Sequence, residues 1–136
     1  MNSLKTWVAI VLGVAFLRIG FLHFTQPEPF DAIIPPYLPF TRFWTFASGI
    51  LEILLGLGLM LPKMRQRAAL CMALLLVLMY PANLNMWLND IPFGQTRFET
   101  HGHIIRLLIQ IILILVCLWI SRRLKGARAQ VTDAET

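Results

Sequence analysis

The stretch over residues 43–61 constrains the fold of this 136-residue chain more than any other. It is an almost unbroken apolar run, long enough at about 1.5 Å per residue in a helix to cross a hydrocarbon core of about 30 Å. A single carboxylate, Glu52, lies at its middle. Because a charged side chain at the centre of a bilayer costs about 2.5–3.5 kcal/mol, we expect Glu52 to be protonated, paired or directed into a polar cavity.

Three further segments have the length and composition of membrane-spanning helices. They cover residues 4–24, 68–88 and 104–121. Hydrophobic residues make up 57% of the chain and charged residues 14%, a balance outside the range of ordinary soluble domains. The sequence therefore predicts an all-α fold, a polytopic membrane four-helix bundle over residues 1–124, followed by a flexible cytoplasmic tail over residues 125–136.

Basic residues lie just outside the apolar segments, where they set the orientation of a membrane protein. When the loops alternate between the two sides, only Arg42 and Arg97 fall on one side. The basic residues on the other side are Lys5, Lys63, Arg65, Arg67, Arg122, Arg123, Lys125 and Arg128. We therefore expect both termini in the cytoplasm. The net charge of +5 then reflects topology, so no nucleic-acid partner is predicted.

The linker between the first two predicted helices, residues 25–41, contains five prolines among large apolar residues. The prolines exclude a continuous helix, and the residues between them are too apolar for a solvated loop. We expect a short helix or turn near residues 30–34 that lies in the outer interface or folds over the mouth of the bundle, with Pro35, Pro36 and Tyr37 as lid or interface residues. An aromatic anchor without any lid role is the alternative.

Polar side chains of four helices gather in the outer half of the predicted bundle. By helical rise, Glu52 lies about 14 Å below the outer end of its helix, and Arg18 lies about 9 Å below the end of its own. Gly49 and Gly56 share the face of Glu52, so that face should look into the bundle. We predict an outward-facing polar pocket with Glu52 at its floor, Arg18 as its nearest partner and Arg106 as the second choice. The candidate pocket residues are Arg18, His23, Glu52, Tyr80, Asn83, Arg106 and Gln110.

The same polar residues also have a purely structural interpretation. They would hold the helices together, because membrane helices lack a hydrophobic drive to associate. Near them, His101 and His103 follow Glu99 and weakly match a metal-binding pattern. Since this spacing is unspecific in a loop, no metal site is predicted.

Four motifs, in order along the chain, resemble the DoxX-like family of small membrane proteins. They are Arg18-x-Gly20-x-x-His23-Phe24, Pro35-Pro36-Tyr37-Leu38-Pro39, Ser48-Gly49-x-x-Glu52-x-x-x-Gly56-x-Gly58 and Tyr80-Pro81-Ala82-Asn83-x-x-Met86. The resemblance covers roughly residues 13–121 and implies a four-helix membrane bundle. That family includes subunits associated with thiosulfate and quinone oxidation, members linked to oxidative-stress complexes, and eukaryotic cargo receptors or assembly chaperones.

The chain has no redox cysteine pair, no flavin motif and no clear set of haem ligands, so we do not expect an autonomous enzyme. We expect an accessory subunit of a bacterial inner membrane that binds a quinone or a lipid in the outer pocket and is linked to a membrane redox system. Its expected partners are the bilayer and redox-complex proteins. One alternative is a proton-coupled transporter, which needs a homo-oligomer. The other is an assembly or interaction protein with a structural polar cluster.

Overall fold

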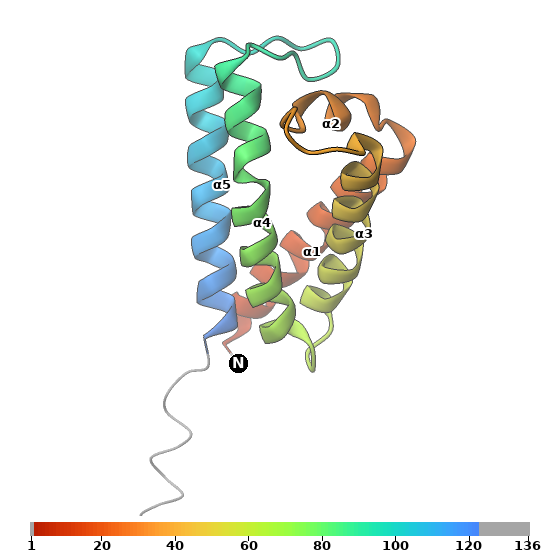
Figure 1. Ribbon diagram of the computed structural model, residues 1–136. Helices are drawn as coiled ribbons and strands as arrows, with labels where there is room; N and C mark the ends of the chain where they lie inside the picture. The colour runs from red at the N-terminus through yellow and green to blue at the C-terminus, as the bar shows by residue number, and fades with distance from the viewer. Residues whose placement is uncertain (1, 123–136) are drawn as a thin grey trace, which may run out of the picture.

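The computed structural model describes residues 2–122. Within that range the protein has five helices, α1 (Ser3–Thr25), α2 (Glu28–Ile33), α3 (Thr41–Met60), α4 (Arg65–Leu88) and α5 (Thr100–Ser121) (Figure 1). All except α2 are long and apolar enough to cross a membrane. The predicted all-helical fold with four long apolar helices is therefore confirmed. The predicted tail over residues 125–136 lies outside the described residues.

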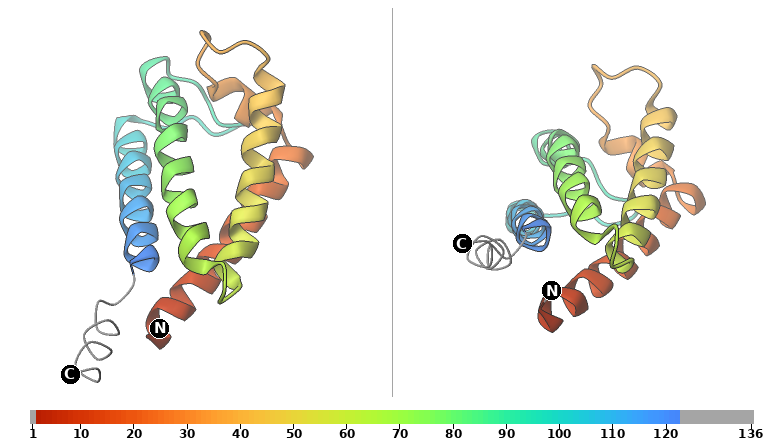
Figure 2. Two further views of the ribbon diagram at one scale, coloured as in Figure 1. Left: turned by 60° about the horizontal axis from the view of Figure 1, so that its bottom comes forward. Right: turned by 90° about the horizontal axis from the view of Figure 1, so that it is seen from below.

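The long helices form two pairs. α1 packs on α3 and α4 packs on α5, while contacts between α3 and α4 join the two pairs. α1 crosses the bundle obliquely, with its first turn near the end of α5 (Figure 2). This arrangement leaves α4 and α5 apart from α1 over most of their length, so polar residues on α1 and on α5 do not converge.

Four glycines bring α1 and α3 into direct backbone contact. A Cβ atom built at Gly13 would lie 2.6 Å from the carbonyl oxygen of Gly56, and one at Gly20 would lie 2.7 Å from that of Gly49. In each helix the two glycines are seven residues apart, about two turns, so they lie on one face. Small residues of this kind let membrane helices approach closely. The predicted inward face around Glu52 is confirmed, because Gly49, Glu52 and Gly56 are all buried.

Two basic side chains cap helices at the end of the bundle where α1 begins and α5 ends. The Nζ of Lys5 donates to the carbonyl oxygens of Trp119 and Arg122, at 2.7 and 3.1 Å. Arg65 donates to two carbonyl oxygens at the end of α3, at 2.7 and 3.0 Å. Both side chains are buried, and a cation at a helix C-terminus interacts favourably with the helix dipole. These two basic residues therefore hold the helix ends.

Replacing Lys5 or Arg65 by methionine should destabilise the protein. Each change keeps an apolar stem but removes the group that donates hydrogen bonds to two carbonyl oxygens. We therefore expect the free energy of unfolding to fall by about 1.5–3 kcal/mol. Thermal unfolding in detergent measures this loss. Arg67→Met changes an exposed arginine of the same helix and is the matched control for Arg65. An equal loss in Arg67→Met would show that charge in general, rather than capping, stabilises this end.

The opposite end is covered by α2 and by the loop between α4 and α5 (Figure 1). Pro29 lies in the first turn of α2, where a helix needs no donor from it. The side chain of Asn85 in α4 donates to the carbonyl oxygen of Ile33 at 3.0 Å. Phe30 meets Phe93 of the loop edge to face, with 5.1 Å between ring centroids. The short helix predicted in the linker is therefore present and is fixed over the bundle.

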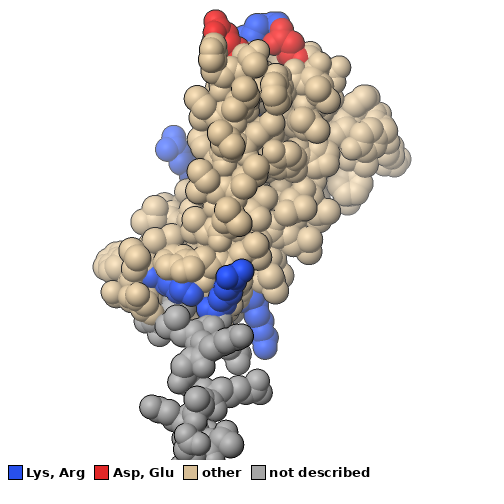
Figure 3. Space-filling view, turned by 90° about the vertical axis from the view of Figure 1, so that its left-hand side faces the viewer, with Lys and Arg blue, Asp and Glu red and all other residues tan. Residues whose placement is uncertain are grey.

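Charged residues gather at the two ends of the molecule. On the face shown in Figure 3, lysines and arginines cluster at the end where α5 finishes, and acidic residues lie at the opposite end on either side of basic atoms. The band between them shows no charged residue apart from one basic side chain at its edge. Many large apolar side chains of the four long helices are exposed. An apolar band between two charged ends is the distribution expected for a chain that spans a bilayer.

Candidate functional site

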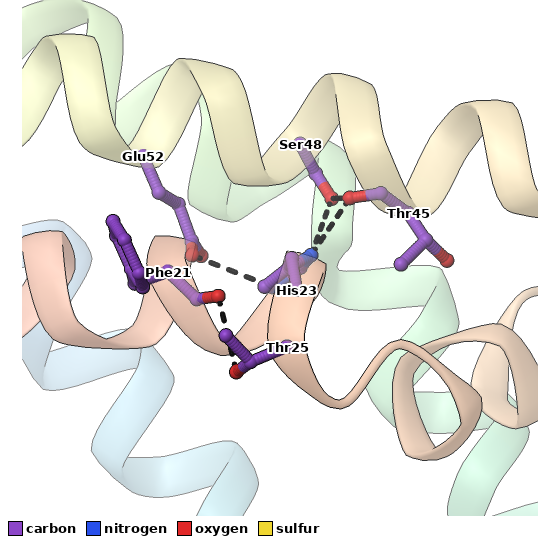
Figure 4. A network of polar contacts seen from close by, with 6 residues as sticks. All are labelled: Phe21, His23, Thr25, Thr45, Ser48 and Glu52. Carbon is purple, nitrogen blue, oxygen red and sulfur yellow. Dashed lines mark hydrogen bonds and ion pairs between the residues drawn. The ribbon is translucent and has the colours of Figure 1, made fainter.

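A buried pair of titratable side chains, His23 and Glu52, forms the centre of the candidate site. His23 lies near the end of α1 and Glu52 in the middle of α3, and their side chains are only 2% and 3% exposed. His23 Nε2 lies 3.4 Å from Glu52 Oε2 (Figure 4). Within residues 2–122 neither atom has a hydrogen-bond partner, so this contact is the nearest polar approach that either atom makes. The isolated acid of the apolar helix α3 therefore faces a histidine of the neighbouring helix.

The other ring nitrogen of His23 is held by α3. His23 Nδ1 lies 2.8 Å from the carbonyl oxygen of Thr45 and 3.1 Å from Ser48 Oγ. Because a carbonyl oxygen only accepts, Nδ1 carries the hydrogen in this contact. The hydroxyl of Ser48 donates to the same carbonyl oxygen at 3.0 Å. Three residues of α3 thus surround one imidazole ring (Figure 4).

With a hydrogen on Nδ1, the pair holds one shared proton. A neutral imidazole then presents a bare Nε2, which would repel a carboxylate at 3.4 Å but accepts from a carboxylic acid. The other state, an imidazolium beside a carboxylate, contains the same number of protons. In both states the proton lies between Nε2 of His23 and Oε2 of Glu52, and the pair has no net charge. A neutral pair is the form in which an acid is tolerated inside an apolar bundle.

The glycine face of α1 positions this pair. Gly13, Phe16, Gly20 and His23 follow one another at spacings of three and four, and all four are buried. A Cβ atom built at Gly49 would lie 2.6 Å from the Cβ of His23, so the close approach of the histidine requires glycine there. The residues that let α1 and α3 meet therefore also place the imidazole beside Glu52.

A cavity of about 380 Å³ adjoins His23 between α3 and α4. Its volume lies within the range of small-molecule sites. The polar groups near the histidine come from Thr45 and Ser48, and the remainder of the lining is largely apolar. The apolar lining includes Phe30, Ile33, Ile34, Leu38, Leu51, Leu75, Leu78, Met79, Pro81 and Ala82. Glu52 is not among the described residues that line the cavity, so His23 stands between the acid and the cavity.

The segment that follows α2 covers one side of the cavity. Pro35 and Tyr37 line it, whereas Pro36 does not. Pro35 is buried and Tyr37 is 72% exposed. Phe30 of α2 stacks on the ring of His23 with 3.7 Å between centroids. Two of the three residues predicted for a lid thus lie against the cavity.

An ion pair near the surface fixes α2 to α3. The guanidinium of Arg42 donates to Asp31 Oδ2 at 2.8 Å, and Thr45 Oγ1 donates to Asp31 Oδ1 at 2.6 Å. Thr45 therefore connects this surface pair with the carbonyl contact to His23. This contact could not be predicted from the sequence. Asp31 belongs to the linker and Arg42 to the start of a helix, and the sequence pattern does not determine how these two segments are placed relative to each other.

The predicted pairing of Arg18 with Glu52 is wrong. Arg18 lies on the exposed face of α1, whereas the face with Gly20 and His23 packs on α3. Two residues correspond to about 200° around a helix, so the side chain of Arg18 starts on the side opposite Gly20. Helical rise gives the depth of a residue along the helix but not its direction, and here the direction decides the partner.

Asn83, Arg106 and Gln110 form a separate network between α4 and α5. Arg106 Nη2 donates to Asn83 Oδ1 at 2.9 Å, and Asn83 Nδ2 donates to Gln110 Oε1 at 2.8 Å. Gln110 Nε2 donates to the carbonyl oxygen of Leu76 at 2.7 Å. None of the three lines the cavity, and neither does Tyr80. The predicted pocket residues therefore do not form one site. Asn83, Arg106 and Gln110 join α4 to α5 away from the cavity.

Gln110→Leu should lower stability by about 1 kcal/mol, the usual scale of a polar contact between membrane helices. The change leaves the amide of Asn83 and the carbonyl group of Leu76 without their partners. Ligand binding in the cavity should be unaffected, because the network lies outside the lining. Unfolding temperature and ligand occupancy, measured on the same preparation, test both statements. If Gln110→Leu were stable but bound no ligand, the network would contribute to ligand binding, contrary to this prediction.

The residues of the weak metal-binding pattern do not come together, because His101 and Glu99 are exposed and His103 is buried. His101 is exposed beside Glu99, with 3.7 Å between Nδ1 and Oε2. His103 is buried, and its ring lies 6.2 Å from that of Trp87. Across residues 2–122, no three His, Cys, Asp or Glu side chains are grouped so that they could hold a metal ion.

The chain matches a described protein family over most of its length. A family model described as Domain of unknown function (DUF8561) matches residues 12–121. That span contains the His23–Glu52 pair, the network between α4 and α5, and the complete cavity lining. No curated protein and no solved structure matches the chain.

Proposed function

We propose that this chain, which belongs to the family described as Domain of unknown function (DUF8561), is an accessory membrane protein that binds a small amphipathic ligand, a quinone or a lipid. One observation carries the proposal: a largely apolar cavity of about 380 Å³ has three polar side chains, His23, Thr45 and Ser48, close together in its lining. An apolar cavity with a few convergent polar groups is the common form of a small-molecule site.

The proposed orientation has both termini in the cytoplasm, because the basic residues are unevenly divided between the two ends. The cavity lies beside α2 and would then open in the outer half of the membrane. The resemblance to DoxX-like proteins supports a bacterial inner membrane and a membrane redox system as the setting. Proteins of that system, and a second copy of the chain, are the proposed protein partners.

The ligand would reach the cavity from the bilayer. Leu51 of α3 and Leu78 of α4 both line the cavity, and their side chains are 45% and 67% exposed. Exposed leucines on membrane-spanning helices face acyl chains, so the opening between them faces lipid. An apolar tail would lie along these leucines, with the polar head group directed toward Ser48 and His23.

Native mass spectrometry of the protein, purified from membranes in a mild detergent, tests this function. The wild type should retain a lipid-soluble molecule with a hydroxyl or carbonyl head group. Ala82→Trp fills the cavity from α4 and should abolish retention. Leu84→Trp introduces the same side chain at an exposed position outside the lining and is the control. Finding no bound molecule in the wild type, or equal retention in both variants, would overturn the proposal.

A further inference from the structure

We propose that Glu52, His23 and Ser48 form a proton relay between the buried acid and the head group of the ligand in the cavity. The inference rests on the proposed ligand-binding function and adds an exchange of protons to it. The class of ligand that this relay serves is an amphipathic molecule with an ionisable oxygen, such as a phenol or an enol.

The relay has two short steps. Glu52 Oε2 lies 3.4 Å from His23 Nε2, and His23 Nδ1 lies 3.1 Å from Ser48 Oγ. Ser48 lines the cavity, whereas Glu52 does not. The imidazole lies between the two α3 side chains in Figure 4. An imidazole suits this position, because one ring nitrogen accepts a proton while the other donates.

The transfer balances without any further reactant. The hydroxyl of Ser48 gives its proton to the anionic oxygen of the ligand and takes the proton on His23 Nδ1. His23 Nε2 then takes the proton of the Glu52 carboxylic acid. The ligand becomes neutral, Glu52 becomes a carboxylate, and the imidazole changes tautomer. The hydroxyl of Ser48, which donated to the carbonyl oxygen of Thr45 before the transfer, then donates to the bare Nδ1 of His23. The same steps in reverse reload Glu52 when a neutral ligand gives up its proton.

Other charged groups near the pair have their own partners or face away from it. On α1, the side chain of Arg18 lies on the opposite, exposed face. Asp31 of α2 and Arg42 of α3 pair with each other at the surface. From α4, the described residues that line the cavity are all apolar. A proton that leaves Glu52 therefore has the ring of His23 as its nearest acceptor.

The experiment uses 4-heptyl-7-hydroxycoumarin, an amphipathic phenol whose neutral and anionic forms absorb at different wavelengths. The probe is added as the anion to the full-length protein in weakly buffered detergent, and absorption and proton uptake from the medium are followed together. In the wild type the bound probe should become neutral with almost no uptake, because Glu52 supplies the proton. In Glu52→Gln the probe should stay anionic or take up about one proton from the medium for each molecule neutralised.

Glu52→Gln is a suitable variant because its amide N–H still donates to His23 Nε2 but releases no proton. Ser48→Ala interrupts the second step and should behave like Glu52→Gln. Bound probe that becomes neutral in the wild type with about one proton taken up would overturn the relay and leave ligand binding intact. A wild type that binds no more probe than empty micelles would overturn both proposals. Unfolding temperatures of the variants verify that each is folded.

Discussion

Gly49→Leu should separate α1 from α3 and remove the candidate site. A Cβ atom at this position lies 2.6 Å from the Cβ of His23 and 3.1 Å from the carbonyl oxygen of Gly20. Both atoms are fixed to the backbone of α1, so the helix itself has to move. We expect a loss of about 3 kcal/mol or more, the upper range for overpacked sites. Thermal unfolding in detergent, followed by circular dichroism, measures the loss.

Ala15→Leu is the matched control, because it adds the same side chain on the exposed face of α1. It should unfold at the wild-type temperature. Gly49→Ala should lie between the two, since the Cβ atom alone already makes the contact. A Gly49→Leu variant as stable as the wild type would show that the glycine contacts do not hold this helix pair together.

His23→Leu should destabilise the protein more than removal of the whole pair. The single change leaves Glu52 buried without a partner, and breaking a buried pair on one side costs about 3–5 kcal/mol. The double variant His23→Leu and Glu52→Leu removes both polar groups and should lie within about 1 kcal/mol of the wild type. The four unfolding free energies of this double-mutant cycle give the coupling between the two side chains.

Glu52→Gln is the control for this cycle and should remain close to the wild type, because an amide N–H replaces the hydroxyl that faces His23 Nε2. If the effects of the two leucine substitutions simply added, the two side chains would not be coupled. That result would contradict a proton shared between His23 and Glu52.

The helices could be predicted because the apolar runs are long and uninterrupted. The ends of the helices were predicted less accurately. α4 begins at Arg65 and α5 at Thr100, three and four residues before the apolar runs from which they were predicted. Hydropathy reports the part of a helix that suits a membrane, whereas a helix continues through polar residues for as long as its backbone is hydrogen bonded. The short helix α2 was predicted because the prolines exclude a longer helix and the residues between them are too apolar for a solvated loop.

The partner of Glu52 was predictable in principle. Gly13 and Gly20 mark the face of α1 that meets another helix, and His23 lies three residues further on the same face. Arg18 lies on the opposite face, so the glycine spacing would have excluded it. The cavity was not predictable in this way, because it depends on how α2 and the two helix pairs are placed, which no local pattern in the sequence specifies.

The most direct test of the proposed binding site is to locate the ligand by photo-crosslinking in native membranes. A long-chain alcohol with a diazirine group in its tail is activated by light, and peptide mass spectrometry maps its attachment sites. We expect attachment at cavity residues such as Leu51 and Met79, and its loss in Ala82→Trp. Attachment spread evenly over the exposed faces of α1 and α5, and unchanged in Ala82→Trp, would contradict a ligand-binding cavity between α3 and α4.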